Sequence, residues 1–325
     1  MGRTMKIQWM FWLVVAAVAG PGCKKKEEPA AKPAAAPAAA PAQPEAAALP
    51  VAATAIGDAG HVTAAVAEPD PTKNAWNLPA RGTAAKEGDR CFVLTQGKDR
   101  SYADGTKPYR LFAHDIGEAK GDTVVIKELA GGSFKTTGLF VIASGSQPAE
   151  VKVGDMVLAE WASELKHAIV QKVEGDKITV RYTDLPDSWP EAQLVKVLTP
   201  REVTRQKEGL QPGNFAIAKG DQGRDELVLL VSESGTNWLV RKFSQRVASV
   251  ATSDVRAIPL KPTVRVGQLV EVPWVGQFYT GKVVKVAGTR VEVKSDAVAM
   301  KEPIVASLGQ VAPVEPKGAA PKAAK

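Results

Sequence analysis

Two tryptophans in this chain stand at the same distance from a preceding glycine. Trp161 follows Gly154 by seven residues, and Trp274 follows Gly267 by seven. An indole has a large flat face on which a proline ring or another flat group can stack, and such stacking is worth about 0.5–1.5 kcal/mol per aromatic pair. The same face attracts cations. These residues therefore indicate binding by stacking rather than a covalent reaction.

The sequence lacks the usual motifs of catalysis. It contains no Gly-x-Ser-x-Gly, no His-Glu-x-x-His and no phosphate loop of the Walker type. Asp115 follows His114, but neighbouring residues of a strand point to opposite faces. Cys91 lies between two large residues in an expected strand, so we interpret it as a buried core thiol. With three histidines and two cysteines in the chain, we expect no metal, no cofactor and no enzymatic activity.

The elements that carry these residues repeat along the chain. Glycines at positions 88, 154, 213 and 267 each open a segment, at a spacing of 54–66 residues. A second glycine, suited to a turn, follows the opening glycine by 21 or 22 residues in the last three copies. In the first copy it follows by 33, which indicates an insertion near 97–107. These turn glycines are Gly121, Gly175, Gly235 and Gly288.

Within each copy, short runs alternate apolar and polar residues and are punctuated by Gly, Asp and Ser, as in strands joined by turns. The runs 170–178 and 283–293 each predict a hairpin. Five short strands in a copy predict a small closed barrel, because closure removes exposed sheet edges. Such small barrels bury little surface alone, so we expect neighbours to pack. The predicted fold class is all-β, with four tandem five-stranded barrels at 86–148, 150–203, 208–260 and 263–314.

The second copy carries an ordered set of further features. Gly154-Asp155 is followed by Ala-x-Trp at 159–161, Ala-x-Val at 168–170, Val-x-Tyr-x-Asp at 180–184 and Leu-x-Pro at 198–200. In this order they resemble a Tudor domain, which belongs to the wider Src-homology-3-like barrel class. The resemblance is less full in the last copy and loose in the first and third. It implies Tudor-like barrels, a fold that hosts many functions and does not settle one.

Tudor readers hold methylated Arg or Lys in a cage of aromatic rings. By this resemblance, four aromatic residues are the ligand-binding candidates: Trp161, Tyr182, Trp274 and Tyr279. Lys166 and Ser295 stand where further aromatics would complete the two cages, so each site is half a cage. We expect Trp189, in a predicted loop, at the rim of the same face, and Trp238 in the core. The alternative is that the aromatics only cover the open face of a barrel or contact the next module.

Residues 1–23 are typical of an export signal. Arg3 and Lys6 precede an apolar stretch at 7–20, which is shorter than the roughly 20 residues that a membrane-spanning helix needs. Small residues then lead to Cys23. This ending resembles the lipobox of bacterial lipoproteins, in which the cysteine is lipidated, although Gly20 stands where the motif has leucine. A plain signal peptide with an incidental cysteine and a retained short membrane anchor are the alternatives.

The resemblance implies a lipid-anchored protein of the bacterial cell envelope. Lys24, rather than Asp, follows the cysteine, and by resemblance to enterobacterial sorting this favours the outer membrane. Residues 24–85 are rich in Ala and Pro and have few large apolar side chains, which predicts a disordered linker. We expect Trp76, the one aromatic residue of this linker, to pack on the edge of the first module. The tail 315–325 has a similar composition and is also predicted to be disordered.

The net charge of +7 does not concentrate in the predicted modules. The signal and the tail carry +2 each and 24–85 is neutral, so that +3 remains for 86–314. This distribution makes nucleic acid an unexpected partner. We expect a non-enzymatic binding or scaffolding protein, anchored by lipid, that contacts an envelope protein, a peptide or a cell-wall ligand. The alternatives are a reader of nucleic acid or methylated residues and, less favoured, an envelope enzyme. The sequence makes no prediction of the oligomeric state.

Overall fold

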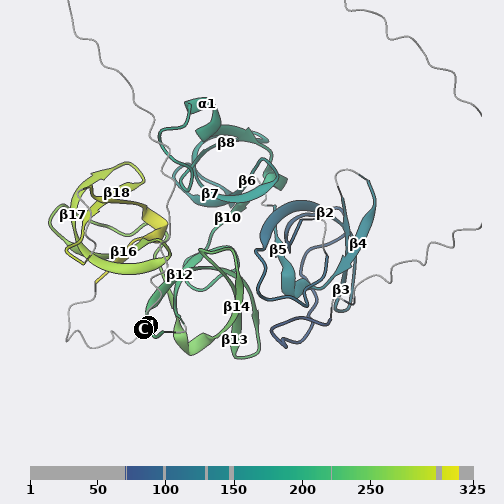
Figure 1. Cartoon of the computed structure of the whole chain (residues 1–325). Coiled ribbons are helices and arrows are strands. Elements are labelled where there is room, and N and C mark those ends of the chain that lie inside the picture. The colour runs from purple at the N-terminus through teal and green to yellow at the C-terminus, as the bar shows by residue number, and fades with distance from the viewer. Residues whose placement is uncertain are drawn as a thin grey trace, which may run out of the picture. The chain divides into compact units, whose positions relative to one another are not determined.

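A computed structural model of the chain describes residues 70, 72–97, 100–128, 131–145, 150–220, 222–297 and 302–314 (Figure 1). These residues belong to the second of two units, 65–325. The predicted signal with Cys23, residues 24–69 of the predicted linker, and the tail 315–325 lie outside the described residues. Among the residues described, no helix has the length and apolar character needed to cross a bilayer.

The described residues form an all-β structure, as predicted, in which the strands fall into four groups of five. The strands of group 1 are β1 (Arg90–Thr95), β2 (Arg110–Lys120), β3 (Thr123–Lys127), β4 (Ser133–Thr136) and β5 (Val141–Ala143). The strands of group 2 are β6 (Met156–Trp161), β7 (Glu164–Glu174), β8 (Lys177–Tyr182), β9 (Val195–Leu198) and β10 (Val203–Arg205). β10 extends two residues beyond the predicted range 150–203.

Groups 3 and 4 follow the same plan. The strands of group 3 are β11 (Phe215–Lys219), β12 (Asp225–Ser234), β13 (Asn237–Lys242), β14 (Val247–Ala251) and β15 (Val255–Ala257). The strands of group 4 are β16 (Leu269–Trp274), β17 (Gln277–Ala287), β18 (Arg290–Lys294), β19 (Ile304–Ser307) and β20 (Ala312–Pro313). Both groups lie within their predicted ranges, 208–260 and 263–314.

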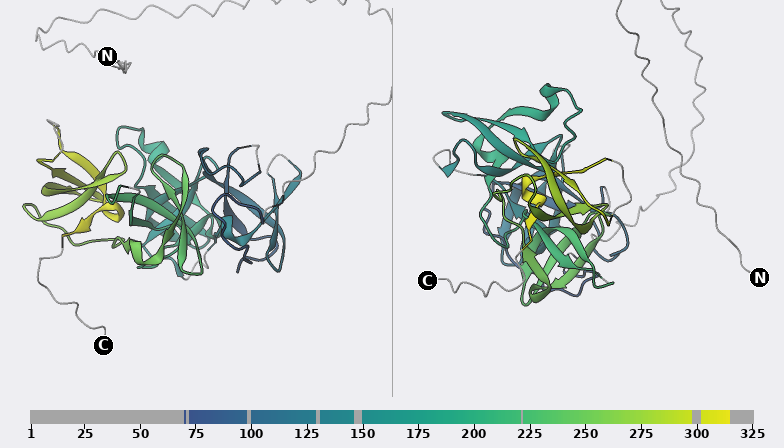
Figure 2. Two further views of the ribbon diagram at one scale, coloured as in Figure 1. Left: turned by 60° about the horizontal axis from the view of Figure 1, so that its bottom comes forward. Right: turned by 90° about the vertical axis from the view of Figure 1, so that its left-hand side faces the viewer.

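Every group has the same antiparallel strand order, in which the fifth strand pairs with the first and the first four pair in sequence. A short 3-10 turn precedes each fifth strand. These turns are η1 (Gly138–Phe140), η3 (Pro200–Glu202), η4 (Thr252–Asp254) and η5 (Leu308–Gln310). Group 2 alone among the described strand groups also has a short α-helix, α1 (Glu191–Leu194). Figure 2 shows how the strands of the groups curve.

Glycine spacing predicts the turns because the backbone there requires a positive φ. Gly175 and Gly288 each have a φ of 58° at the hairpin between the second and third strands of their groups. Gly235 and Gly121 lie in the equivalent hairpins of groups 3 and 1, with φ angles of 62° and 58°. Glycine adopts this left-handed conformation without the steric cost that a Cβ imposes. The predicted hairpins around these residues are confirmed.

The four groups are joined in two pairs, which the sequence analysis did not predict. Groups 1 and 2 form one ten-stranded sheet, and groups 3 and 4 form the other. Both joints connect the second strands of the two groups, β2 with β7 and β12 with β17. At each joint a backbone N–H of the earlier group donates to the turn after the first strand of the later one. The bonds run from Ala113 to Ser163 and from Leu227 to Gly276, each 2.7 Å long.

Apolar residues form both a core within each group and a core shared between groups. β1 illustrates this, because its residues are buried on both faces. Cys91 and Val93 face the core of group 1, while Phe92 and Leu94 join a cluster that also contains Leu158 of group 2 and residues of group 3. The expectation that neighbouring modules pack is therefore confirmed.

The structured region begins before the predicted end of the linker. Trp76 packs against Tyr109, with ring centroids 5.6 Å apart, and against Phe140 at 6.1 Å. Its indole N–H donates to the carbonyl oxygen of Val247 at 3.0 Å, and Leu78 is buried in the shared core. The predicted contact of Trp76 with the first module is confirmed. The prediction that the linker extends to residue 85 is wrong, because Trp76 and Leu78 and the backbone bonds of Ala75 and Arg81 to group 1 hold this short segment.

Candidate functional site

The two tryptophans of equal offset end the first strands of groups 2 and 4. Trp161 pairs with Glu164, and Trp274 pairs with Gln277, so that each hairpin closes through a two-residue turn. The φ angles of the turn residues are 48° and 66° at Ala162 and Ser163, and 49° and 82° at Val275 and Gly276. Both turns are thus of the type that matches the twist of a hairpin. The tryptophans occupy equivalent places in their groups, as the shared offset predicts.

The residues in these two turns are unfavourable for the left-handed backbone conformation that the turns adopt. Such turns favour Asn-Gly or Gly-Gly, because a residue with a Cβ in the left-handed region costs about 1–2 kcal/mol. Val275 is β-branched, has a φ of 49° and remains 66% exposed. An exposed apolar residue held in a strained conformation indicates a role other than stability.

In group 2, Trp161 meets a second tryptophan. The ring of Trp189, in the segment between β8 and α1, lies 5.3 Å from the ring of Trp161 at an interplanar angle of 44°. Both rings are half-buried and pack on the core of group 2. The indole N–H of Trp161 donates to the carbonyl oxygen of Gln193 at 3.2 Å. With this donor occupied, Trp161 contributes its ring face to any ligand rather than a hydrogen bond.

The structure places Tyr182 in the core. Its side chain is 1% exposed, and its hydroxyl donates to the carbonyl oxygen of Glu160. Burial raises the pKa of Tyr182. The ring therefore supports the apolar cluster beneath Trp161 and has no free face, which corrects its assignment as a ligand-binding candidate. Trp189, expected only at the rim, is the second ring of the site.

In group 4, Trp274 and Tyr279 lie on one face of the hairpin. Trp274 is 37% exposed, and the half-buried Tyr279 donates its hydroxyl to Oε1 of Gln277 at 3.2 Å. The register places both aromatics on the same face as the buried Val272, because side chains alternate along a strand. Val272 belongs to the core of group 4, so both aromatics lie on the core side of the hairpin. Ser295 occupies the position of Tyr182 and donates to the carbonyl oxygen of Thr280 at 2.7 Å.

We name these two places the aromatic rims: Trp161 with Trp189, and Trp274 with Tyr279. Carboxylates close in sequence to the first rim already have cationic partners. The pairs are Glu160 with Arg90, Glu164 with Arg110, and Glu191 with Arg181. A methylated lysine cage is stronger when carboxylates are free to complement the cation. The first rim therefore suits neutral stacking better than cation binding.

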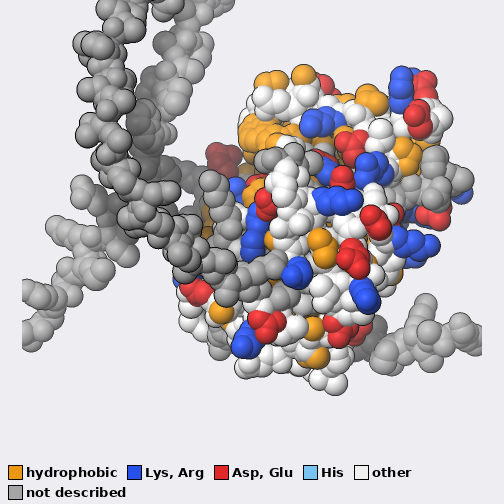
Figure 3. Space-filling view, turned by 90° about the vertical axis from the view of Figure 1, so that its right-hand side faces the viewer, with side chains coloured by type: hydrophobic (Ala, Val, Ile, Leu, Met, Phe, Trp, Pro, Cys, Tyr) orange, Lys and Arg blue, Asp and Glu red, His pale blue; other side chains and the backbone are white. Residues whose placement is uncertain are grey.

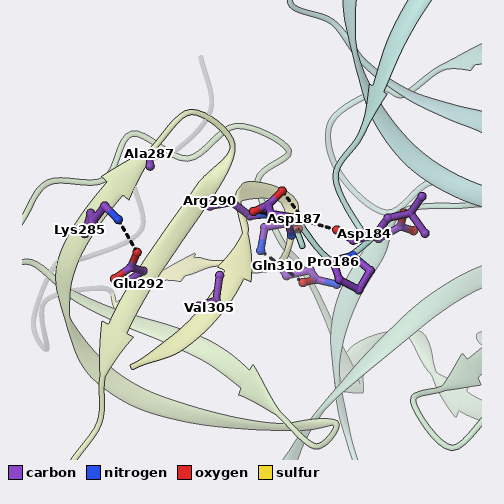
Figure 4. A pocket seen from close by; sticks show the side chains of 11 residues that line it. Asp184, Pro186, Asp187, Lys285, Ala287, Arg290, Glu292, Val305 and Gln310 are labelled. Atoms are coloured by element: carbon purple, nitrogen blue, oxygen red, sulfur yellow. Dashed lines mark hydrogen bonds and ion pairs between the residues drawn. The ribbon is translucent and has the colours of Figure 1, made fainter. Parts of the chain in front are cut away.

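The segment that carries Trp189 is held by group 4. Arg290 of β18 donates to both carboxylate oxygens of Asp187, at 2.9 and 3.3 Å, and to the carbonyl oxygen of Leu185. Arg290 also donates to Oγ of Ser307 at 2.7 Å, and that hydroxyl donates to the carbonyl oxygen of Thr183. Figure 4 shows Arg290 and Asp187 at a cavity of about 630 Å³ that both residues line. Group 4 therefore holds the segment that carries Trp189, which is one of the two rings of the first rim.

The residues considered for catalysis do not form a reactive cluster. Cys91 is fully buried, and its thiol lies 3.6 Å from the carbonyl oxygen of His114, in agreement with a core thiol. Burial raises the pKa of Cys91 to about 12, so the nucleophilic thiolate is suppressed. No group of three or more metal-donor side chains occurs in the part of the chain that the structure describes.

Comparison with known proteins gives matches among solved structures. No protein-family model and no curated protein matches the chain. Among the 49 matching chains of solved structures is the crystal structure of Arabidopsis thaliana AGDP1 AGD34. The identity is 13% and the TM-score 0.21, over 38% of this chain and 83% of that chain.

Sequence reasoning missed the contacts that assemble the first rim. Arg290 and Asp187 are 103 residues apart, and neither stands in a motif. The sequence did indicate a role for Trp189, because a tryptophan between Ser188 and Pro190 in a predicted loop is not expected to belong to a hydrophobic core. The strained turn at Val275 also left a trace, because Val-Gly stands where the hairpin favours Asn-Gly or Gly-Gly.

Proposed function

We propose that this protein is a non-enzymatic, lipid-anchored scaffold of the bacterial cell envelope. In this proposal each strand group is a Tudor-like barrel, and the aromatic rims bind short proline-containing peptide segments by stacking. The observation that carries the proposal is the equivalent placement of Trp161 and Trp274 on strained turns, each with a second aromatic side chain. A purely structural tryptophan would not need an unfavourable turn beside it.

The geometry supports weak and multiple contacts. One stacked aromatic pair contributes about 0.5–1.5 kcal/mol, so a single rim binds weakly. Two rims on one chain raise the local concentration of binding sites for a ligand that reaches both. A protein with many weak contacts suits a scaffold, whose partners must exchange.

A peptide ligand is favoured over nucleic acid by the distribution of charge. Nucleic-acid surfaces collect Lys and Arg on one face. In the face shown in Figure 3, basic and acidic side chains are interspersed. Many of the basic side chains also have acidic partners, as Arg90, Arg110 and Arg181 do. The reader of nucleic acid or methylated residues is therefore the less favoured alternative.

The location rests on Cys23 and the segment before it. Two acyl chains on Cys23 would anchor the protein stably at a membrane. The Pro and Ala residues after it would set the barrels away from the lipid. In this arrangement the rims are free to meet proteins or peptides near the membrane, and the outer membrane is the proposed site.

The proposal is tested with decaproline as the probe and the double variant Trp161→Ala with Trp274→Ala. We expect fluorescently labelled decaproline to bind the full-length protein and to bind the double variant at least tenfold more weakly. The thermal midpoint should fall by only a few degrees, because both rings are partly exposed. Trp238→Ala is the matched control, since Trp238 is 2% exposed and its loss should destabilise group 3 strongly. If the double variant unfolds as Trp238→Ala does, the two tryptophans are core residues and the proposal fails.

A further inference from the structure

A second cavity, of about 330 Å³, lies where side chains of groups 2, 3 and 4 meet. We name it the junction cavity. Its polar lining includes Lys166, Asp184, Arg241 and Lys242, and its apolar lining includes Phe243 and Val275. A volume of this size is within the range of ligand pockets and far exceeds the roughly 30 Å³ of one water molecule. It is separate from the faces of Trp161 and Trp189.

Arg241 is the most unusual residue of the junction cavity. It lies on β13, and its Nε is shielded from solvent and has no hydrogen-bond partner among the described residues. Burial lowers the pKa of Arg241, and the nearby Glu164 and Asp184 only partly oppose this. Shielded polar groups in folded proteins almost always have a partner. Because the Arg241 side chain lines the cavity, this unpaired donor marks a hydrogen-bonding position for a molecule that enters it.

The other two cations of the junction cavity already have partners. Lys166 lies 3.2 Å from the carboxylate of Glu164, and Lys242 lies 3.2 Å from the carboxylate of Glu226. They therefore contribute little net attraction for an anion. Arg241 remains as the available donor.

Asp184, which lines this cavity and two others, also has an unpaired acceptor. Oδ2 of Asp184 accepts the backbone N–H of His167 at 3.0 Å and lies 3.2 Å from Nδ1 of that ring. Oδ1 of Asp184 is buried and has no partner among the described residues. A ligand that satisfies both groups must accept from Arg241 and donate to Asp184. A carboxamide does both, whereas a carboxylate can only accept and would meet the charge of Asp184.

The apolar wall of the cavity adds a requirement for an apolar side chain. Phe243 is 63% exposed and Val275 is 66% exposed. The two residues are neighbours, because the backbone of Gly276, next to Val275, approaches the Phe243 side chain so closely that a Cβ on Gly276 would lie 2.7 Å from it. Exposed apolar side chains of this size beside a polar cavity are typical of a binding surface.

We propose that the junction cavity binds the carboxamide group of a peptide, which accepts from Arg241 and donates to Asp184, next to an apolar side chain that packs on Phe243 and Val275. This inference rests on the proposed function, since it assigns the chemistry of a peptide ligand. The junction cavity would recognise polar groups of the peptide, whereas the aromatic rims recognise flat faces. The strained turn at Val275 then serves both, because it places Trp274 at the rim and Val275 at the cavity.

The test is a titration of the full-length protein, labelled with ¹⁵N at Arg and Trp, followed by nuclear magnetic resonance. The probe is 4-methylpentanamide, and the matched probes are 4-methylpentanoate, which has a carboxylate in place of the carboxamide, and acetamide, which lacks the apolar side chain. We expect 4-methylpentanamide to shift the Nε–H signal of Arg241 and to bind at least fivefold more tightly than either matched probe. Tighter binding of 4-methylpentanoate would overturn the proposal in favour of an anion site. No shift with any probe would mean that water alone fills the cavity and would also overturn it.

Three variants keep the test independent of folding. Arg241→Lys removes Nε while keeping the charge, and Val275→Gly removes the apolar wall while relieving the strained φ; each should weaken binding at least fivefold. Arg246→Lys, at an exposed position near the cavity, should leave binding unchanged. Unchanged binding in both Arg241→Lys and Val275→Gly would contradict the proposal. The indole signals of Trp161 and Trp274 in a decaproline titration report the rims separately, so the two proposals can fail independently.

Discussion

Replacing Arg290 by glutamine should loosen the segment that carries Trp189. The Arg290 side chain is 16% exposed, and the Asp187 side chain is 49% exposed. A partly exposed ion pair contributes about 0–1 kcal/mol. The bonds to Leu185 and Ser307 have a charged donor, and each contributes about 1.5–3 kcal/mol. Because glutamine can restore one of these bonds, the loss is the other bond and the ion pair, and we expect the free energy of unfolding to fall by about 1.5–4 kcal/mol.

Two measurements test this prediction. Urea denaturation gives the change in the free energy of unfolding. The circular dichroism of the Trp161–Trp189 pair gives its geometry, because two indoles 5.3 Å apart couple their transitions and produce a pair of bands of opposite sign. We expect Arg290→Gln to weaken these bands at a urea concentration where the protein is still folded. Arg290→Lys should restore part of the stability but not the paired contact with Asp187.

Lys285→Gln is the matched control. Lys285 lies on the neighbouring strand β17 and pairs with Glu292 at 2.8 Å, at an exposed position beside the same cavity. Its replacement should leave both measurements unchanged. Should Arg290→Gln leave the stability and the coupled bands as they are in the native protein, group 4 does not position Trp189.

Three further predictions concern the turn, a buried histidine and the anchor. Val275→Gly should raise the free energy of unfolding by about 1 kcal/mol, since relief of the left-handed strain exceeds the entropy that glycine loses on folding; a lower value from urea denaturation would contradict the strained turn. Burial lowers the pKa of His114 from 6.5, because the folded protein favours the neutral ring. The stability that comes with the neutral ring is therefore present above pH 6.5 and is lost as the pH falls toward the folded-state pKa. The free energy of unfolding of His114→Gln should therefore fall less between pH 7.5 and pH 5 than that of the native protein. An equal fall in both proteins would refute the lowered pKa of His114. Cys23→Ser should leave the protein in the soluble fraction after membrane sedimentation, and continued sedimentation would contradict lipidation.

Strand positions and turns could be predicted because they depend on local chemistry. A left-handed backbone favours glycine at Gly121, Gly175, Gly235 and Gly288, and so a repeated turn leaves a repeated glycine. The alternation between these turns then marks the strands. The places of Trp161 and Trp274 follow from the same register, so the equal spacing from the preceding glycine predicts that the two residues are equivalent.

The contacts between groups could not be predicted in this way. The bond from Arg290 to Asp187 and the pairing of the second strands join residues far apart in sequence, and no local pattern records them. Tyr182 was misassigned because a strand pattern shows that alternate residues share a face but not which ring is covered. The packing of Trp76 was predicted, but the start of the structured segment was not, because the average composition of a low-complexity stretch hides single buried residues such as Leu78.

The central claim is that both aromatic rims bind a peptide by stacking. The most direct measurement is a titration of the full-length protein, ¹⁵N-labelled at tryptophan, with decaproline. We predict that the indole signals of Trp161, Trp189 and Trp274 shift together with one another and saturate, while that of the buried Trp238 stays in place. Unchanged signals from Trp161, Trp189 and Trp274 at millimolar decaproline would contradict the claim.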